Sequence, residues 1–120
     1  MPDDERRLSA EEQAVILALL VQDLPGVQEL RSQVSSAVVA GRCGCGCATV
    51  DLRPGAGPPA LDAPVQDGVL VSAHTRTRGD GVLLFVEHGH LSYLEVYATE
   101  DEPAPLPRPE DLVVEPVGSW

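Results

Sequence analysis

The stretch GVLVSAHTRTRGDGVLLFVEHGHLSYLEVYA, residues 68–98, decides the fold that we expect for this chain. It contains three runs rich in apolar and β-branched residues, at 68–78, 82–87 and 91–98, separated by two short turns that contain glycine. Runs of this length and composition are typical of strands, and turns this short join antiparallel neighbours. The stretch therefore predicts three consecutive antiparallel strands.

Alternation of side chains assigns faces to these strands, because successive residues of a strand point to opposite sides of a sheet. The run 82–87 is almost entirely apolar, which predicts a central strand covered on both faces. In the last run, Tyr93, Glu95 and Tyr97 are expected to share one face. In the first run, the alternation places Val69, Val71 and Ala73 on one face, and Leu70, Ser72, His74 and Arg76 on the other.

Upstream of these strands, the sequence predicts a helix that begins at Ala10. Ser9 and Glu12 have the spacing of a capping box, in which each side chain bonds the backbone N–H of the other residue. Pro25-Gly26 is expected to end this helix. Residues 14–21 are all apolar and would cover most of its circumference. Such a helix must be sandwiched within the core or must contact another chain, and both interpretations stay open.

The remaining segments complete an α+β fold, a single domain over residues 1–120. One or two N-terminal helices are expected to pack on one face of an antiparallel meander of about five strands. We expect a short second helix at 26–33, strands at 35–40 and 48–52, a surface loop at 53–67, extended or flexible segments at 1–8 and 99–109, and a helical turn or strand at 111–114.

The charge balance excludes two classes of partner. Eight basic residues, all arginine, stand against 19 acidic ones, for a formal net charge of -11. Phosphate backbones and anionic membrane surfaces would be repelled, so we expect no binding to nucleic acid or to membranes. The acidity favours solubility and could steer the chain to a basic partner. The apolar run 14–21 is too short to span a bilayer, and three cysteines form no secreted disulfide framework, so a cytoplasmic location is expected.

The cysteines themselves form the most unusual local feature. Cys43, Cys45 and Cys47 alternate with glycines, so their thiolates could converge on one soft metal ion such as zinc. A structural zinc site needs a fourth ligand, for which the candidates are His74, His88 and His90. The spacing differs from the usual Cys-x-x-Cys pattern, so two other interpretations stay open. The cysteines could be small packing residues, or they could serve thiol redox chemistry.

A catalytic role has little support in the sequence. The chain lacks a phosphate-binding loop, a nucleophile elbow and a His-Glu-x-x-His pair, and the absence of lysine excludes Schiff-base chemistry through its side chain. His74 and the face of Tyr93, Glu95 and Tyr97 could line a shallow site if they shared one side of the sheet. His88 and His90, which flank a turn glycine, are more typical of a polar turn. Whether the chain is an enzyme stays uncertain, with the balance toward none.

The tripeptide Arg78-Gly79-Asp80 spells an adhesion motif of extracellular proteins. Between two strands and followed by a second glycine, it is more typical of a hairpin turn. We interpret it as the turn.

Four short motifs occur together in this chain: LPG at 24–26, ELRSQ at 29–33, CGCGCATVDL at 43–52 and LSYLEVY at 91–97. In these motifs the chain resembles a family of small uncharacterised proteins that are common in high-GC Gram-positive bacteria. The resemblance covers most of the chain between residues 10 and 110. It implies a domain of unknown function whose hallmark is the cysteine segment, and it carries over no catalytic residue.

The leading hypothesis is a non-enzymatic cytoplasmic protein that acts through protein contacts, as a regulatory, immunity-like or inhibitor-like partner. A homodimer through the apolar helix fits the same features. The alternative is a metal-binding or thiol-redox protein centred on Cys43, Cys45 and Cys47.

Overall fold

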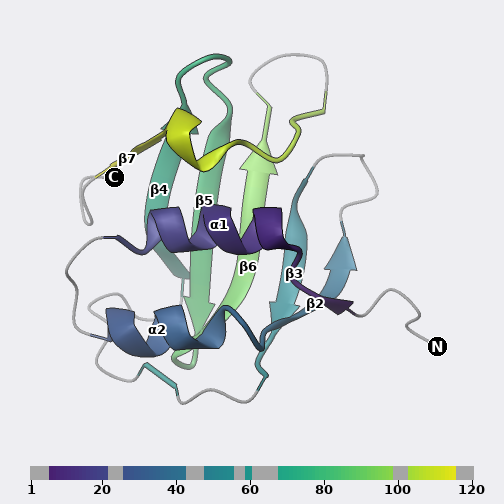
Figure 1. The fold of residues 1–120 in the computed structure, drawn as a ribbon, viewed down its shortest axis with the longest axis vertical. Coiled ribbons are helices and arrows are strands. Elements are labelled where there is room, and N and C mark those ends of the chain that lie inside the picture. Colours follow the sequence, from purple (N-terminus) through teal and green to yellow (C-terminus); the bar gives the residue numbers. More distant parts are fainter. Residues whose placement is uncertain are drawn as a thin grey trace.

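The computed structural model describes residues 6–21, 26–42, 48–55, 59–60, 68–98 and 103–115. Two helices lie across one face of a seven-stranded sheet, which makes the fold α+β, as predicted (Figure 1). The elements in chain order are β1 (Arg6–Arg7), α1 (Ala10–Leu19), α2 (Val27–Gln33), β2 (Val38–Arg42), β3 (Val50–Arg53), β4 (Gly68–Thr75), β5 (Gly81–Glu87), β6 (His90–Tyr97), the 3-10 helix η1 (Pro109–Asp111) and β7 (Leu112–Val114).

The sheet has the order β1-β2-β3-β6-β5-β4-β7, and all its neighbouring strands are antiparallel. The expectation of about five strands in a meander is therefore wrong in two respects. The edges add β1, whose two residues are too few to show a strand pattern, and β7, whose three residues lie in the segment 111–114 that the sequence left open between a helical turn and a strand. In addition, β6 returns to pair with β3, so that the hairpin β2–β3 and the meander β4–β5–β6 join into one sheet. Very short edge strands leave little open edge for strand addition by another chain.

A bulge in β4 changes the faces that simple alternation assigns. Val69 pairs with Phe85, but Val71 pairs with Leu84, so one extra residue is inserted between them. Leu70 and Val71 are consequently both buried on the helix side. The placements of Leu70 with Ser72 and His74, and of Val69 with Val71 and Ala73, are therefore wrong. Alternation cannot reveal a bulge, because the register shift depends on the partner strand.

The strand β5 lies inside the sheet, between β4 and β6, as its apolar run predicts. The two described helices cover only one of its faces. On the other face, Leu83 and Phe85 are half-buried, and the Phe85 ring meets the Tyr93 ring edge-on with centroids 5.5 Å apart.

The capping box that the sequence predicts is present at the start of α1. Ser9 Oγ accepts from the Glu12 backbone N–H, and Glu12 Oε1 accepts from the Ser9 N–H. The helix ends at Leu19, earlier than expected from Pro25, which lies outside the described residues. Arg31 Nη1 donates to the Leu20 carbonyl, which satisfies a backbone acceptor just beyond the last turn of α1.

The core lies between the helices and the sheet. The largest fully buried side chains are Ile16, Leu19, Leu20, Leu30, Leu70, Leu84, Leu91, Leu94, Val15, Val39, Val71 and Val82. Aliphatic side chains alone fill this list, which agrees with the sequence's single Phe and single Trp. Such a core depends on many close contacts between small branched groups.

Buried Gln33 ties α2 to the β5–β6 turn. Its Nε2 donates to the Gly89 carbonyl at 2.9 Å, and its Oε1 accepts from the Leu91 N–H at 2.9 Å. Gly89 has a φ of 77°, in the left-handed region that favours glycine. Among the described helices, none has the length and apolar character to cross a bilayer.

Candidate functional site

The three cysteines lie in segment 43–47, outside the described residues. Within the described part of the chain, no group of three or more His, Cys, Asp or Glu side chains could hold a metal ion. The zinc site therefore stays a prediction. Elemental analysis of protein purified without chelator should find close to one zinc or similar ion per chain if it is correct.

The three histidines are placed at opposite ends of the sheet. His74 pairs with Gly81 at the start of β5, whereas His90 pairs with Glu87 at its end. At about 3.3 Å per residue, the length of β5 separates them by roughly 20 Å. His88 lies in the β5–β6 turn, next to His90 at the start of β6. One metal ion thus cannot take both His74 and a histidine of this turn.

The hypothesis of one shared polar face is correct in its geometry. His74 pairs with Gly81, and Gly81 pairs with Tyr97, so His74 and Tyr97 project from the same side of the sheet. Tyr93 and Glu95 follow on that side by alternation. This is the side that the described helices leave uncovered. Neither of the two cavities described below is lined by these residues.

The two cavities lie on either side of residues 105–109, which cross the molecule between α1 and the β4–β5 turn (Figure 1). One has a volume of about 390 Å³ and is an apolar groove lined by α1 and this segment, through Ala10, Glu11, Ala14, Leu106, Pro107, Arg108 and Pro109. We call it the helix groove. The other has a volume of about 400 Å³ and lies against the β4–β5 turn. We call it the turn cavity.

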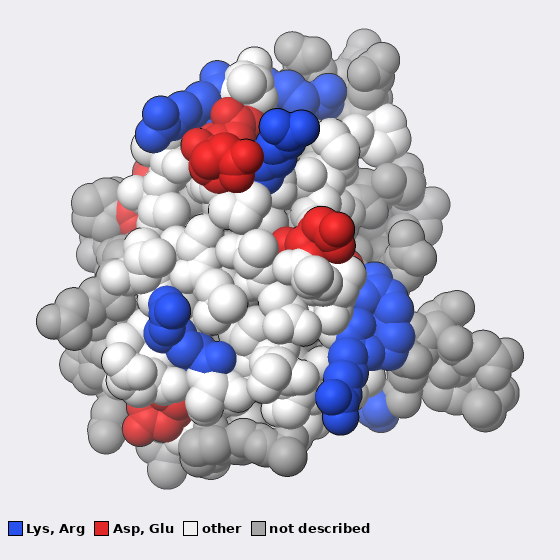
Figure 2. All heavy atoms as spheres, viewed as in Figure 1, with Lys and Arg blue, Asp and Glu red and all other residues white. Residues whose placement is uncertain are grey.

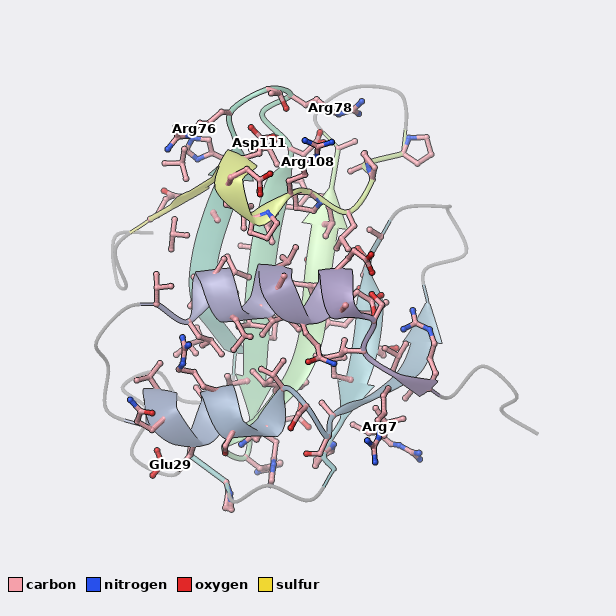
Figure 3. The ribbon with its side chains drawn as sticks, viewed as in Figure 1. Arg7, Glu29, Arg76, Arg78, Arg108 and Asp111 are labelled. Carbon is pink, nitrogen blue, oxygen red and sulfur yellow. The ribbon has the colours of Figure 1, made fainter. Side chains whose placement is uncertain are left out.

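The turn cavity is lined by charged and hydroxyl side chains, including Thr75, Thr77, Arg78, Asp80, Arg108 and Asp111. Figure 3 shows that Arg76, Arg78, Arg108 and Asp111 gather at this end of the sheet. Arg108 and Leu106 line both cavities. Sequence reasoning missed this site, because its walls come from segments about thirty residues apart.

The structure confirms that Arg78-Gly79-Asp80 lies in the turn between β4 and β5. Gly79 has a φ of 73°, and the Asp80 N–H donates to Thr75 Oγ1 while the Thr75 N–H donates to the Asp80 carbonyl. Asp80 is only 1% exposed, and its Oδ2 accepts from Arg78 Nε at 2.8 Å. A buried aspartate bound to its own arginine cannot present the tripeptide to a receptor.

The helix α1 is apolar on its outward side as well as toward the core. Ala10, Ala14, Leu17 and Val21 follow one another at helical spacing opposite the buried residues Val15, Ile16 and Leu19. Val21 is 68% exposed, the largest exposure of any large hydrophobic side chain described. Figure 2 shows mostly uncharged atoms across the middle of this side of the molecule, with an acidic patch to the right of the middle and basic and acidic groups together at the top. Residues 106–109 lie beside Ala10 and Ala14, and Leu17 is partly buried against the core. Ala10 and Val21, the latter just beyond the end of α1, are exposed.

No family model, no curated protein and no solved structure matches this chain. The resemblance to the bacterial family therefore stays a prediction from residues 24–33, 43–52 and 91–97, and the argument for function depends on the sites themselves.

Proposed function

We propose that this chain is a non-enzymatic protein-interaction module of the cytoplasm, which holds an apolar, carboxylate-bearing segment of a partner protein against the outward side of α1. The observation that carries the proposal is the outward apolar row Ala10, Ala14, Leu17 and Val21 beside the helix groove. A helix on a protein surface normally presents polar residues to water, and a continuous apolar row marks a contact surface.

The groove is lined by one carboxylate, Glu11, and one cation, Arg108, and the cation supports the choice of partner. Arg108 lines the groove, is exposed, and has no salt bridge among the described residues. In a chain with 19 acidic and eight basic residues, an arginine left without a carboxylate is available to a partner. All eight arginines but only ten of the acidic residues lie in the described ranges, so this part of the chain is less acidic than the whole. The partner segment would place an apolar side chain in the groove and a carboxylate on Arg108.

Selection from a displayed library of random peptides tests this proposal. Peptides enriched on the wild-type protein should combine large apolar residues with Asp or Glu. They should lose about tenfold or more in affinity for Ala14→Asp, which puts a charge in the groove, and for Arg108→Glu.

Two variants serve as matched controls. Gln28→Asp adds the same charge to an exposed position of α2, and Arg7→Glu makes the same reversal at an exposed arginine outside the groove. Both should bind as the wild type does. A library that yields no enriched peptide, or peptides that bind all four variants equally, would overturn the proposal.

A further inference from the structure

The turn cavity holds a buried carboxylate whose hydrogen bonding is incomplete. The Asp80 side chain is 2% exposed, and Arg78 Nε binds only its Oδ2. Its Oδ1 is buried and has no hydrogen-bond partner among the described residues. Buried carboxylate oxygens almost always accept at least one hydrogen bond, so a missing donor at this position requires an explanation.

A positive group lines the same cavity. Arg108 is exposed and forms no salt bridge among the described residues, although Glu110 and Asp111 follow closely in the chain. Asp111 Oδ2 accepts from the Thr77 hydroxyl at 2.7 Å, which fixes a second carboxylate at the cavity wall. The cavity therefore offers carboxylate acceptors at Asp80, Glu110 and Asp111 and guanidinium donors at Arg108 and at Arg78, of which Arg78 already binds Asp80.

A ligand with a single charge would match only part of this lining. An anion would find Arg108 but would also meet the carboxylates of Glu110 and Asp111, and a simple amine would leave the Arg108 guanidinium unmatched. A small molecule with both an ammonium and a carboxylate satisfies the two sets of groups together. The apolar carbons of Leu106 and Pro107 remain to contact its uncharged part.

We propose that the turn cavity is a binding site for a small zwitterion of the α-amino acid class. The ammonium donates to Asp80 Oδ1 and to Asp111, and the carboxylate accepts from Arg108. The volume of about 400 Å³ is within the range of small-molecule sites and exceeds what an amino acid needs. The site lies on the other side of residues 105–108 from the helix groove, so the inference goes beyond the proposed function.

Ligand-observed NMR and thermal shift on the full chain test the inference, with each proteinogenic amino acid as probe in turn. For any amino acid that binds, two analogues follow, the amine without the carboxylate and the acid without the amine. For L-leucine these are 3-methylbutylamine and 4-methylpentanoic acid. At least one amino acid should bind, and both of its analogues should bind about tenfold or more weakly.

Variants then assign the site. Asp80→Asn and Arg108→Gln should each weaken the binding about tenfold or more, and Asp111→Asn serves if Asp80→Asn does not fold. Glu12→Gln, at the other arginine–carboxylate pair, and Arg7→Gln should leave the affinity unchanged. Ala14→Asp in the helix groove should also leave it unchanged, which separates this site from peptide binding.

The inference is wrong if no amino acid binds, if either singly charged analogue binds as well as its parent, or if Glu12→Gln and Arg7→Gln weaken the binding as much as the cavity variants do. None of these results would affect the peptide selection at the helix groove.

Discussion

Two arginine–carboxylate salt bridges among the described residues have the same length and differ in how many of the carboxylate oxygens have a hydrogen-bond donor. Arg6 holds Glu12 with two bonds, Nη1 to Oε1 at 2.8 Å and Nη2 to Oε2 at 3.0 Å, and the Ser9 N–H adds a third. Arg78 holds Asp80 with one bond of 2.8 Å, although the Asp80 side chain is more deeply buried, at 2% against 10% exposure.

This difference separates a structural role from a candidate site. Both oxygens of Glu12 have donors, so the pair fastens β1 to the start of α1 and has nothing to offer a ligand. Asp80 keeps an acceptor without a donor at the wall of a cavity. A buried polar group with incomplete hydrogen bonding costs stability, and proteins tolerate that cost mainly at sites of function.

The largest effect is expected at the incomplete pair. Asp80→Ala would leave the guanidinium of Arg78, which is 33% exposed, without the carboxylate, and should lower the free energy of unfolding by about 2–3 kcal/mol. Urea denaturation followed by circular dichroism measures this loss. If Asp80→Ala lowered the free energy of unfolding by less than Glu12→Ala does, the more deeply buried carboxylate would not be the more important one for stability.

Glu12→Ala should cost about 1–2 kcal/mol in the same measurement, because it removes half of the capping box and the partner of Arg6. Ser9→Ala removes the other half of the box and should cost about 1 kcal/mol. If Glu12→Ala cost no more than Ser9→Ala, the bonds from Arg6 would contribute nothing to stability.

The pH dependence of stability gives a smaller and independent test of the complete pair. Hydrogen bonds from the Arg6 guanidinium hold the pKa of Glu12 below its ordinary value, against the opposing effect of burial. The stabilisation is therefore complete above the pKa of an unfolded glutamate, about 4.3, and is lost as the pH falls through the lowered folded value. As the pH is lowered from 7 to 2, the urea midpoint of unfolding should fall more steeply for the wild type than for Glu12→Gln. Equal slopes would mean that the carboxylate gains no stabilisation from folding.

The smallest effect is expected for Arg6→Gln. The side chain is 39% exposed, and pairs at the surface contribute little, so the loss should be about 0.5 kcal/mol. Arg7→Gln is the matched control, since Arg7 forms no salt bridge among the described residues, and it should change stability less than Arg6→Gln does. A larger loss for Arg7→Gln than for Arg6→Gln would show that β1 is stabilised by its positive charge as such rather than by the salt bridge between Arg6 and Glu12.

Local patterns were sufficient to predict much of the fold. The Ser9–Glu12 box, the second helix, the three strands between residues 68 and 98 and the turn at Arg78-Gly79-Asp80 all depend on residues near one another in the chain. Helix caps, strand alternation and glycine turns are local effects of backbone geometry, which explains why one sequence is enough to find them.

Features that join distant segments were not predictable from such patterns. The sequence predicts an extended or flexible segment around Arg6, and only the folded chain brings β1 beside β2 and the Arg6 guanidinium onto Glu12. The turn cavity likewise needs residues 105–111 to cross against the β4–β5 turn. Its acceptors and its arginine are unremarkable when they are considered separately.

By itself the sequence determined the α+β class, the start of α1 and the apolar character of that helix on both sides. The tertiary structure alone decided that one of those sides packs on the sheet while the other borders the helix groove, that β6 pairs with β3, and that Asp80 and Arg108 line the same cavity. The physical reason is that propensity and alternation act between neighbours in the chain. Which surfaces and charges meet depends on the packing of the whole chain.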